Sequence, residues 1–179
     1  MLRTIVAALA LLLVSVGSIQ AAGDVPPVVH GAMPERLVVP SIGVDAPVVV
    51  VGLDEEGGMV SPDGPDPVGW YTFSPTPGQP GNTVLSGHRD WRTGVTGVFW
   101  RLGELVPGDR ISVVLADGNE VAYEVVLSVL VGPDDMTIEE IVGQTPEEII
   151  TLITCEGVFD AETKEYDKRR VVWANRVAS

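Results

Sequence analysis

The sequence predicts a mainly β protein, and the simplest architecture for it is a closed β-barrel with short helices at its crossings. Short apolar runs rich in β-branched residues recur along the chain, and glycine or proline turns separate them. We count about eight such runs and few segments with helical periodicity. There is no internal repeat and no low-complexity tail. The pattern therefore favours one β domain.

The first 23 residues have the layout of a secretory signal. Arg3 precedes an apolar stretch from Ile5 to Val16, and small residues at 20–23 resemble a cleavage region. The apolar stretch is shorter than the ~20 residues of a comfortable membrane span. An uncleaved membrane anchor is the alternative, because residues 4–19 contain no charge. Either way, we expect an extracytoplasmic protein at the cell surface, secreted or membrane-anchored.

The remaining chain divides into a short linker and one domain. Residues 24–35 contain three prolines and form the predicted linker, and the domain covers residues 36–179. Its roughly 155 residues with the linker are enough for one hydrophobic core. The net charge of -14 makes nucleic acid and anionic lipid surfaces poor partners.

The elements follow in order along this domain. Residues 37–39 and 47–51 are predicted strands of a hairpin, separated by Pro-Ser and Asp-Ala turns. Residues 61–80 contain six prolines and three glycines, which predicts a long ordered loop without helix or central strand. Residues 83–86 form a short buried strand, and residues 98–109 form one or two helical turns that end at Pro-Gly.

The second half contains the clearer signals. Residues 110–115 and 120–131 are predicted strands joined by an Asp-Gly turn. The TIEE stretch matches a capping box, so a short helix is expected to begin at Thr137. The similar TPEE stretch is discounted, because the β-branched run at 149–154 favours a strand. A last strand is expected at residues 170–174.

The only cysteine, Cys155, ends the apolar stretch TLITC, and we expect it at the end of a strand. A lone cysteine in an exported protein is an inert buried residue, an intermolecular bridge or a nucleophile. A thiol nucleophile is usually paired with an imidazole. His30 lies in the linker, whereas His88 in LSGHRD follows a strand and is expected at the same rim as Cys155. The alternative for His88 is a polar residue that caps a turn.

Basic residues at 168–170 precede the last strand. A guanidinium there could hold a carbonyl oxygen or its oxyanion. Because side chains alternate along a strand, only one of Arg169 and Arg170 is expected to face the thiol. The alternative is that both are solvated charges at a sheet edge.

Taken together, the order of these motifs resembles the sortase family, the cysteine transpeptidases of the Gram-positive cell surface. The resemblance covers roughly residues 36–177, and TLITC and SGH are its most specific parts. The stretches IGVDAPVVVVGLD, PGQPGNTVLSGHRD, LVPGDRISV and EVAYEV are similar to the actinobacterial-type, class E/F-like branch of that family.

The resemblance implies an eight-stranded sortase-type barrel with Cys155 as nucleophile and His88 as general acid and base. Arg169 matches the family arginine, although some branches place it one or two residues earlier. Thr154 matches a position that helps hold the oxyanion or substrate. The implied reaction cleaves an LPxTG-like motif between Thr and Gly and passes the acyl group to an amine of a lipid-linked wall precursor or a pilin. No cofactor or metal is implied, and calcium at the acidic stretch 160–167 is a minor alternative.

Two other classes of protein compete with this interpretation. Papain-like peptidases place cysteine before histidine, the reverse of this chain, and L,D-transpeptidases have an S-x-G-C-R-like pattern that TLITCEG lacks. The other class is a non-catalytic surface β-barrel that binds a cell-wall component and needs no reactive thiol.

Overall fold

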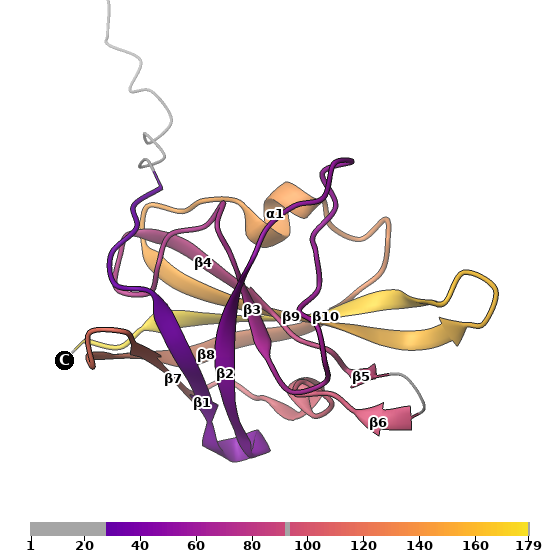
Figure 1. Ribbon diagram of the computed structural model, residues 1–179, viewed down its shortest axis with the longest axis horizontal. Coiled ribbons are helices and arrows are strands. Elements are labelled where there is room, and N and C mark those ends of the chain that lie inside the picture. Colours follow the sequence, from indigo (N-terminus) through magenta and orange to yellow (C-terminus); the bar gives the residue numbers. More distant parts are fainter. Residues whose placement is uncertain (1–27, 92–93, 179) are drawn as a thin grey trace, which may run out of the picture.

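The computed structural model describes residues 28–91 and 94–178. The predicted leader, residues 1–23, lies outside them, as do the first residues of the predicted linker. Eight strands close into a barrel in the order β1-β2-β3-β4-β9-β10-β8-β7 (Figure 1). Their bounds are Pro34–Val39 (β1), Val44–Val51 (β2), Val68–Tyr71 (β3), Gly81–Ser86 (β4), Arg110–Leu115 (β7), Glu120–Val131 (β8), Glu148–Asp160 (β9) and Glu165–Arg176 (β10). The predicted fold class is confirmed.

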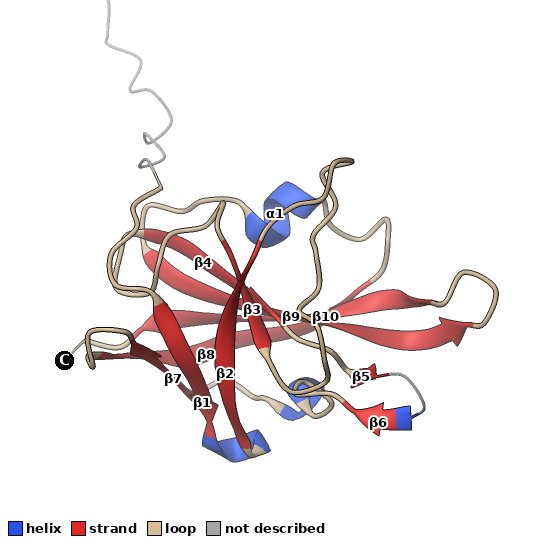
Figure 2. Ribbon diagram, in the orientation of Figure 1, coloured by secondary structure: helices blue, strands red, loops and turns tan. Residues whose placement is uncertain are grey.

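The helical elements are short and lie between the strands, as Figure 2 shows. They are the 3-10 turns Pro40–Ile42 (η1) and Leu102–Glu104 (η3) and the helix Ile138–Val142 (α1). The predicted capping box is confirmed, because the Thr137 hydroxyl accepts from the Glu140 N–H and the Glu140 carboxylate accepts from the Thr137 N–H. Two further strands, Asp90–Trp91 (β5) and Val95–Thr96 (β6), form a separate ribbon.

The prediction for residues 61–80 was wrong in its exclusion of a central strand. Val68–Tyr71 forms β3, which pairs with β2 on one side and β4 on the other. The prolines stop at Pro67 and resume at Pro75, so the four residues of β3 keep the amide donors that a central strand needs. All four are buried, and Trp70 is among the largest buried side chains of the core.

The first hairpin also differs from its prediction. The turn between β1 and β2 is η1 with Gly43 in a left-handed conformation, and Asp45 and Ala46 lie inside β2. Both strands belong to the closed barrel, so the hairpin is not at an edge. β1 begins at Pro34, two residues before the predicted domain boundary, and the His30 ring contacts the ring of Trp70.

Apolar side chains fill the barrel and a second, smaller cluster lies outside it. In the outer cluster, Ile141 of α1 packs with Val131 of β8 and Val171 of β10. Val172, the next residue of β10, belongs to the barrel interior, so β10 is buried on both faces there. Among residues 28–91 and 94–178, no helix has the length and apolar character to cross a membrane.

Candidate active site

Cys155 lies at the barrel rim because its neighbouring strands end beside it. The partner strand β4 ends at Ser86, which pairs with Ile153 of β9, and β8 ends at Val131, which pairs with Arg169 of β10. From this point β9 and β10 continue alone as a two-stranded hairpin that projects from the barrel (Figure 1). The thiol therefore lies where the barrel opens.

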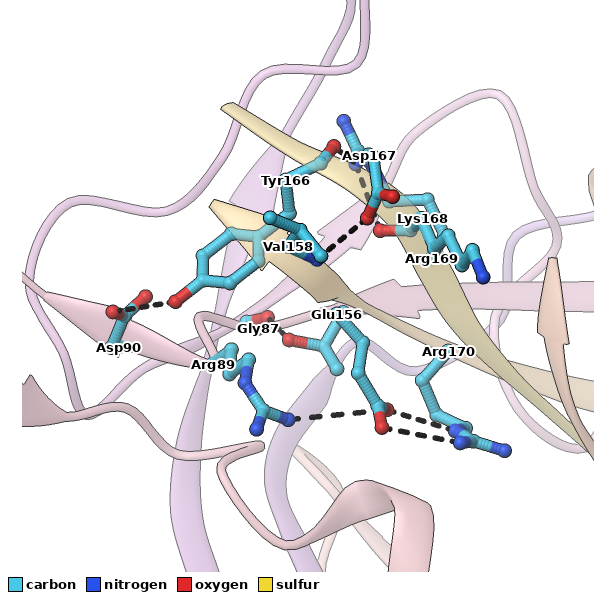
Figure 3. Close-up of polar contacts among 11 residues, drawn as sticks. Gly87, Arg89, Asp90, Glu156, Val158, Tyr166, Asp167, Lys168, Arg169 and Arg170 are labelled. Atoms are coloured by element: carbon cyan, nitrogen blue, oxygen red, sulfur yellow. Dashed lines mark hydrogen bonds and ion pairs between the residues drawn. The ribbon is translucent and has the colours of Figure 1, made fainter. Parts of the chain in front are cut away.

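The prediction that Cys155 ends its strand was wrong. β9 continues to Asp160, and the residues after the cysteine form a β-bulge instead of a turn. Gly157 has φ +100°, and a Cβ there would overlap the carboxylate of Asp167. That carboxylate accepts the Val158 N–H at 2.7 Å, which satisfies the extra residue of the bulge (Figure 3). Bulges of this kind often lie beside active sites, where they re-aim side chains.

Arg169 is the cross-strand partner of Cys155 in the β9–β10 pair. Directly paired residues have their side chains on the same face of the sheet, so the guanidinium and the thiol share a face. The Arg169 Nη1 donates to the carbonyl oxygens of Tyr166 at 2.7 Å and Lys168 at 3.0 Å. These acceptors are neutral, and Arg169 makes no ion pair within the part of the chain that the structure describes.

Arg170 faces the opposite side, as strand alternation predicts. Its Nε donates to Glu156 Oε2 at 2.9 Å and its Nη2 donates to Glu156 Oε1 at 3.2 Å (Figure 3). Arg170 is ion-paired and only 16% of its side chain is exposed, so the alternative of two solvated charges at a sheet edge is wrong for this residue. Arg169 is thus the arginine on the thiol face.

His88 follows β4, is half-buried and is fixed by two contacts. Its Nε2 is 2.8 Å from the carbonyl oxygen of Pro62. A carbonyl oxygen only accepts, so Nε2 carries a proton, and in the neutral ring Nδ1 is the nitrogen with a free lone pair. The ring also meets the ring of Trp91 edge-on, with centroids 4.7 Å apart. The imidazole is therefore oriented by its surroundings.

Two clefts meet at Cys155, His88 and Arg169, which line both. The first cleft has a volume of about 520 Å³ and an apolar wall from Ile138, Ile141, Ile153 and Val171. The second has a volume of about 700 Å³ and lies between the β5–β6 ribbon and the β9–β10 hairpin, with Asp90 and Glu165 in its lining. The structure thus brings the three predicted side chains together at one junction.

Burial raises the pKa of the Cys155 thiol above its ordinary value. The positive charge of Arg169 opposes this and lowers the thiol pKa, whereas the carboxylates of Asp90 and Glu165 raise it further. The direction of the net effect means that the resting thiol is protonated at neutral pH. A nearby base is then needed to make the thiolate.

Thr154 is buried, and its hydroxyl group already donates a hydrogen bond within the protein. The Thr154 Oγ1 donates to the Gly87 carbonyl oxygen at 2.7 Å, and the Gly87 N–H donates to the Ile153 carbonyl at 3.1 Å. The two bonds fasten the turn that leads to His88 onto the strand that contains Cys155. The hydroxyl therefore holds the two motifs together.

Three charged residues close to the thiol were not singled out from the sequence, namely Arg89, Asp90 and Glu156. Asp90 accepts a hydrogen bond from the Tyr166 hydroxyl at 2.8 Å, which joins β5 to the projecting hairpin. Glu156 pairs with Arg170 on the reverse face. The adjacency of Arg89 and Asp90 to His88, and of Glu156 to Cys155, is visible in the sequence, but their partners depend on the register of β9 and β10.

Within residues 28–91 and 94–178, no group of three or more His, Cys, Asp or Glu side chains is arranged to hold a metal ion. In the acidic stretch 160–167, the Asp160 carboxylate accepts the backbone N–H groups of Glu162 and Thr163 and so caps the hairpin turn. The Asp167 carboxylate caps the bulge.

Comparisons with known proteins identify the family and the fold. The sortase domain family matches residues 37–177. Sortase D of Bacillus subtilis (strain 168) is 35% identical over 141 residues, which are 79% of this chain. The chain spans 62% of the length of that relative. The structure of sortase C-1 from Actinomyces oris has a TM-score of 0.63 and 28% identity, covering 80% of this chain and 73% of that one.

Sortase A from Corynebacterium diphtheriae superposes with a TM-score of 0.60 at 24% identity, covering 82% of this chain and 61% of that one, a likeness of fold alone. The matched domain includes both cysteine and histidine motifs. This chain belongs to the sortase family. The predicted class E/F-like branch stays a prediction.

Proposed function

We propose that this chain is a cysteine transpeptidase that cleaves an LPxTG-like sorting motif between Thr and Gly and transfers the protein to an amine. The observation that supports this most is the junction of two clefts at Cys155, His88 and Arg169. A non-catalytic wall-binding barrel needs neither an imidazole nor an unpaired guanidinium beside its only thiol. That alternative is not favoured.

The first step forms a thioester. The Cys155 sulfur attacks the Thr carbonyl carbon while the thiol proton moves to His88. Negative charge develops on the carbonyl oxygen, and the Arg169 guanidinium together with backbone N–H groups, including the Thr154 segment, stabilises it. The C–N bond then breaks, and His88 returns the proton to the departing glycine amine. The raised pKa of the thiol is the reason that His88 must act first as a base.

The second step resolves the thioester. An incoming amine attacks the same carbonyl carbon and loses a proton to His88, the C–S bond breaks, and the thiol of Cys155 recovers a proton from the imidazole. Water can replace the amine and give hydrolysis. The amine donor is a lipid-linked cell-wall precursor or a lysine of a pilin.

The two clefts suit the two substrates. The apolar wall of Ile138, Ile141 and Val171 suits the leucine and proline of a sorting motif. Asp90 lines only the second cleft, whereas Glu165 lines both, and together their carboxylates suit a cationic amine. The protein would act outside the cytoplasm at the cell surface, attached to the membrane by residues 1–23 if these are not removed. Its protein partners would be surface proteins with sorting motifs.

Mass spectrometry of residues 28–179 tests this function. The domain is incubated with a library of LPxTG-type peptides that varies the second and third positions, with and without a glycine amine. We expect a covalent adduct on Cys155 that corresponds to the peptide up to Thr, and a transpeptidation product when the amine is added. Absence of any adduct with every member of the library contradicts the proposal.

A further inference from the structure

Each of the three proposed catalytic residues is followed in the sequence by a charged residue of a second set. Arg89 follows His88, Glu156 follows Cys155, and Arg170 follows Arg169. Side chains of consecutive strand residues point to opposite faces, so Glu156 and Arg170 lie behind the face that holds Cys155 and Arg169. Figure 3 shows that Arg89 and Arg170 both contact the carboxylate of Glu156.

Glu156 is at the centre of this set and contacts both arginines. Arg170 binds its carboxylate with two hydrogen bonds, of 2.9 and 3.2 Å, and Arg89 Nη1 is 3.9 Å from Oε2. The three side chains are 16 to 23% exposed, which is much less than the surface pairs Arg36–Asp45 and Arg101–Glu104. Screening by solvent is weaker at such sites than on the open surface.

Neighbouring groups hold the set in place. The Arg89 guanidinium lies over the ring of Trp100, 4.6 Å from its centroid. Gly103 of η3 approaches so closely that a Cβ there would be 3.2 Å from Arg170 Nε and 3.3 Å from Glu156 Oε2. A larger residue at this position would push the two charged side chains away by a few tenths of an ångström, so glycine lets η3 cover the ion pair without displacing it.

The set joins β9, β10 and the segment after β4 at the point where β9 and β10 leave the barrel. The β4 and β8 strands have both ended, so β9 and β10 have only each other as strand partners beyond Cys155 and Arg169. The segment after β4 contains His88 and reaches β9 through the Thr154–Gly87 bonds and the Arg89–Glu156 ion pair.

We propose that Arg89, Glu156 and Arg170 form a positioning triad that fixes, from the reverse face, the relative placement of His88, Cys155 and Arg169. The triad acts through the backbone it shares with the proposed catalytic residues, and Arg89 also lines the second cleft. It rests on the proposed function, since it explains how that reaction is oriented. Displacements of about 1 Å at a reacting group can lower a rate by about 100-fold.

The test compares Glu156→Gln with a matched control at the other end of the same two strands. Glu148 of β9 pairs with Arg176 of β10 at 3.4 Å, and its side chain is 18% exposed against 20% for Glu156. Glu148 also accepts from the Tyr123 hydroxyl, so Glu148→Gln costs stability without approaching the thiol. The readouts are thermal stability and the kcat and KM of thioester formation with the best-cleaved library peptide.

We expect Glu156→Gln to lower kcat by about tenfold or more with KM within about twofold, since orientation and not binding is lost. Glu148→Gln should keep wild-type kcat although both variants melt at lower temperature. Arg170→Lys keeps the charge pair and should retain more activity than Arg170→Gln, a difference that general destabilisation does not explain.

The outcomes separate the two proposals. If wild type forms no adduct, or Cys155→Ala forms as much as wild type, the proposed function fails and the positioning role fails with it. If wild type is active and Cys155→Ala is not, the results for the Glu156 and Glu148 variants test the positioning role by itself. Wild-type kcat in folded Glu156→Gln, or an equal loss in Glu148→Gln, overturns it.

Discussion

The two faces of the β9–β10 pair each present an arginine at the rim, and the two arginines differ in their hydrogen-bond acceptors. On the thiol face, Arg169 donates only to neutral carbonyl oxygens, so its positive charge is not cancelled by a described carboxylate. On the reverse face, Arg170 is bound by both oxygens of Glu156. Arg169 is therefore available to an anion, whereas the next residue of the strand, Arg170, is already neutralised.

This difference shows how one hairpin can present an unneutralised arginine to the substrate on one face while ion pairs hold its strands in place on the other. A guanidinium that awaits an oxyanion must be held in place without an anionic partner, and carbonyl acceptors do this without neutralising its charge. The ion pairs that fasten the strands lie on the other face, where they do not compete for the oxyanion.

The largest effect is expected from removing the thiol itself. Cys155→Ala should abolish the peptide adduct and all transpeptidation, because no other residue in the chain can form a thioester. The side chain is half-buried and small, so circular dichroism should show an unchanged fold. Turnover at the wild-type rate in this variant would exclude a cysteine mechanism.

The second effect separates the two arginines. Arg169→Ala should lower kcat by about 100-fold or more, which is typical for the loss of an oxyanion donor. Arg169→Lys should recover little, because lysine lacks the planar two-donor fork. Arg170→Ala should cost about tenfold through positioning and should also lower the melting temperature, because it leaves Glu156 without its closest partner. Steady-state kinetics with thermal melts measures both.

An equal loss of kcat in the Arg169 and Arg170 variants, or a larger loss in Arg170→Ala, would contradict the division of roles between the faces. Strand alternation alone predicts only that one of the two arginines faces the thiol. The ion pair with Glu156 gives Arg170 a role of its own, since its removal leaves this partly buried carboxylate with only the longer contact to Arg89.

These residues also show how far sequence reasoning extends. TLITC and SGH predicted a shared rim for Cys155 and His88 on the premise that each ends an apolar strand, which is right for His88 after β4 and wrong for Cys155 within β9. Alternation separated Arg169 from Arg170. The Glu156 pair could not be predicted, because it requires β9 to continue past Gly157. A glycine after a strand ordinarily suggests a turn, and here it forms a bulge whose cap, Asp167, comes from the other strand.

The fold was predictable where turn chemistry is local and not where pairing is long-range. The Asp117–Gly118 hairpin and the capping box at Thr137 depend on a few adjacent residues. β3 depends on partners in β2 and β4 and has only four residues, within a stretch of seven between Pro67 and Pro75. Its burial, which decides the outcome, is a property of the closed barrel and not of the local sequence.

A third, smaller effect concerns the pH dependence of the thiol. Alkylation of Cys155 by iodoacetamide should accelerate as pH rises through a pKa above the ordinary thiol value, because only the thiolate reacts. Asp90→Asn should move the midpoint to lower pH and Arg169→Ala to higher pH, since a negative and a positive charge are removed. Glu120→Gln, at the exposed start of β8, is the control and should leave the profile unchanged.

A midpoint below the ordinary thiol pKa in the wild-type domain would mean that burial does not dominate at this site. Slow labelling at neutral pH, by contrast, is the expected behaviour of this enzyme before substrate binds. The rate at a single neutral pH therefore cannot separate an inert thiol from a catalytic one, and the full profile is needed.

The smallest effect is expected at Thr154, which belongs to neither charged face. Its hydroxyl donates to the Gly87 carbonyl, and it is 3% exposed. Thr154→Val keeps the shape but leaves that buried carbonyl without this donor, which typically costs about 1 to 3 kcal/mol of unfolding free energy. Thr154→Ser keeps the hydroxyl and should lose less. Urea unfolding measures both free energies.

The same pair of variants tests what the bond does for the reaction. If Thr154 fastens the His88 turn to β9, Thr154→Ser should keep most of the wild-type kcat and Thr154→Val should lose severalfold, with KM little changed. If instead the hydroxyl contacts the substrate or the oxyanion, the loss in Thr154→Val should approach that of Arg169→Ala, near 100-fold. Such a loss would show that the bond to Gly87 breaks when substrate binds, and the hydroxyl would then act on the thiol face.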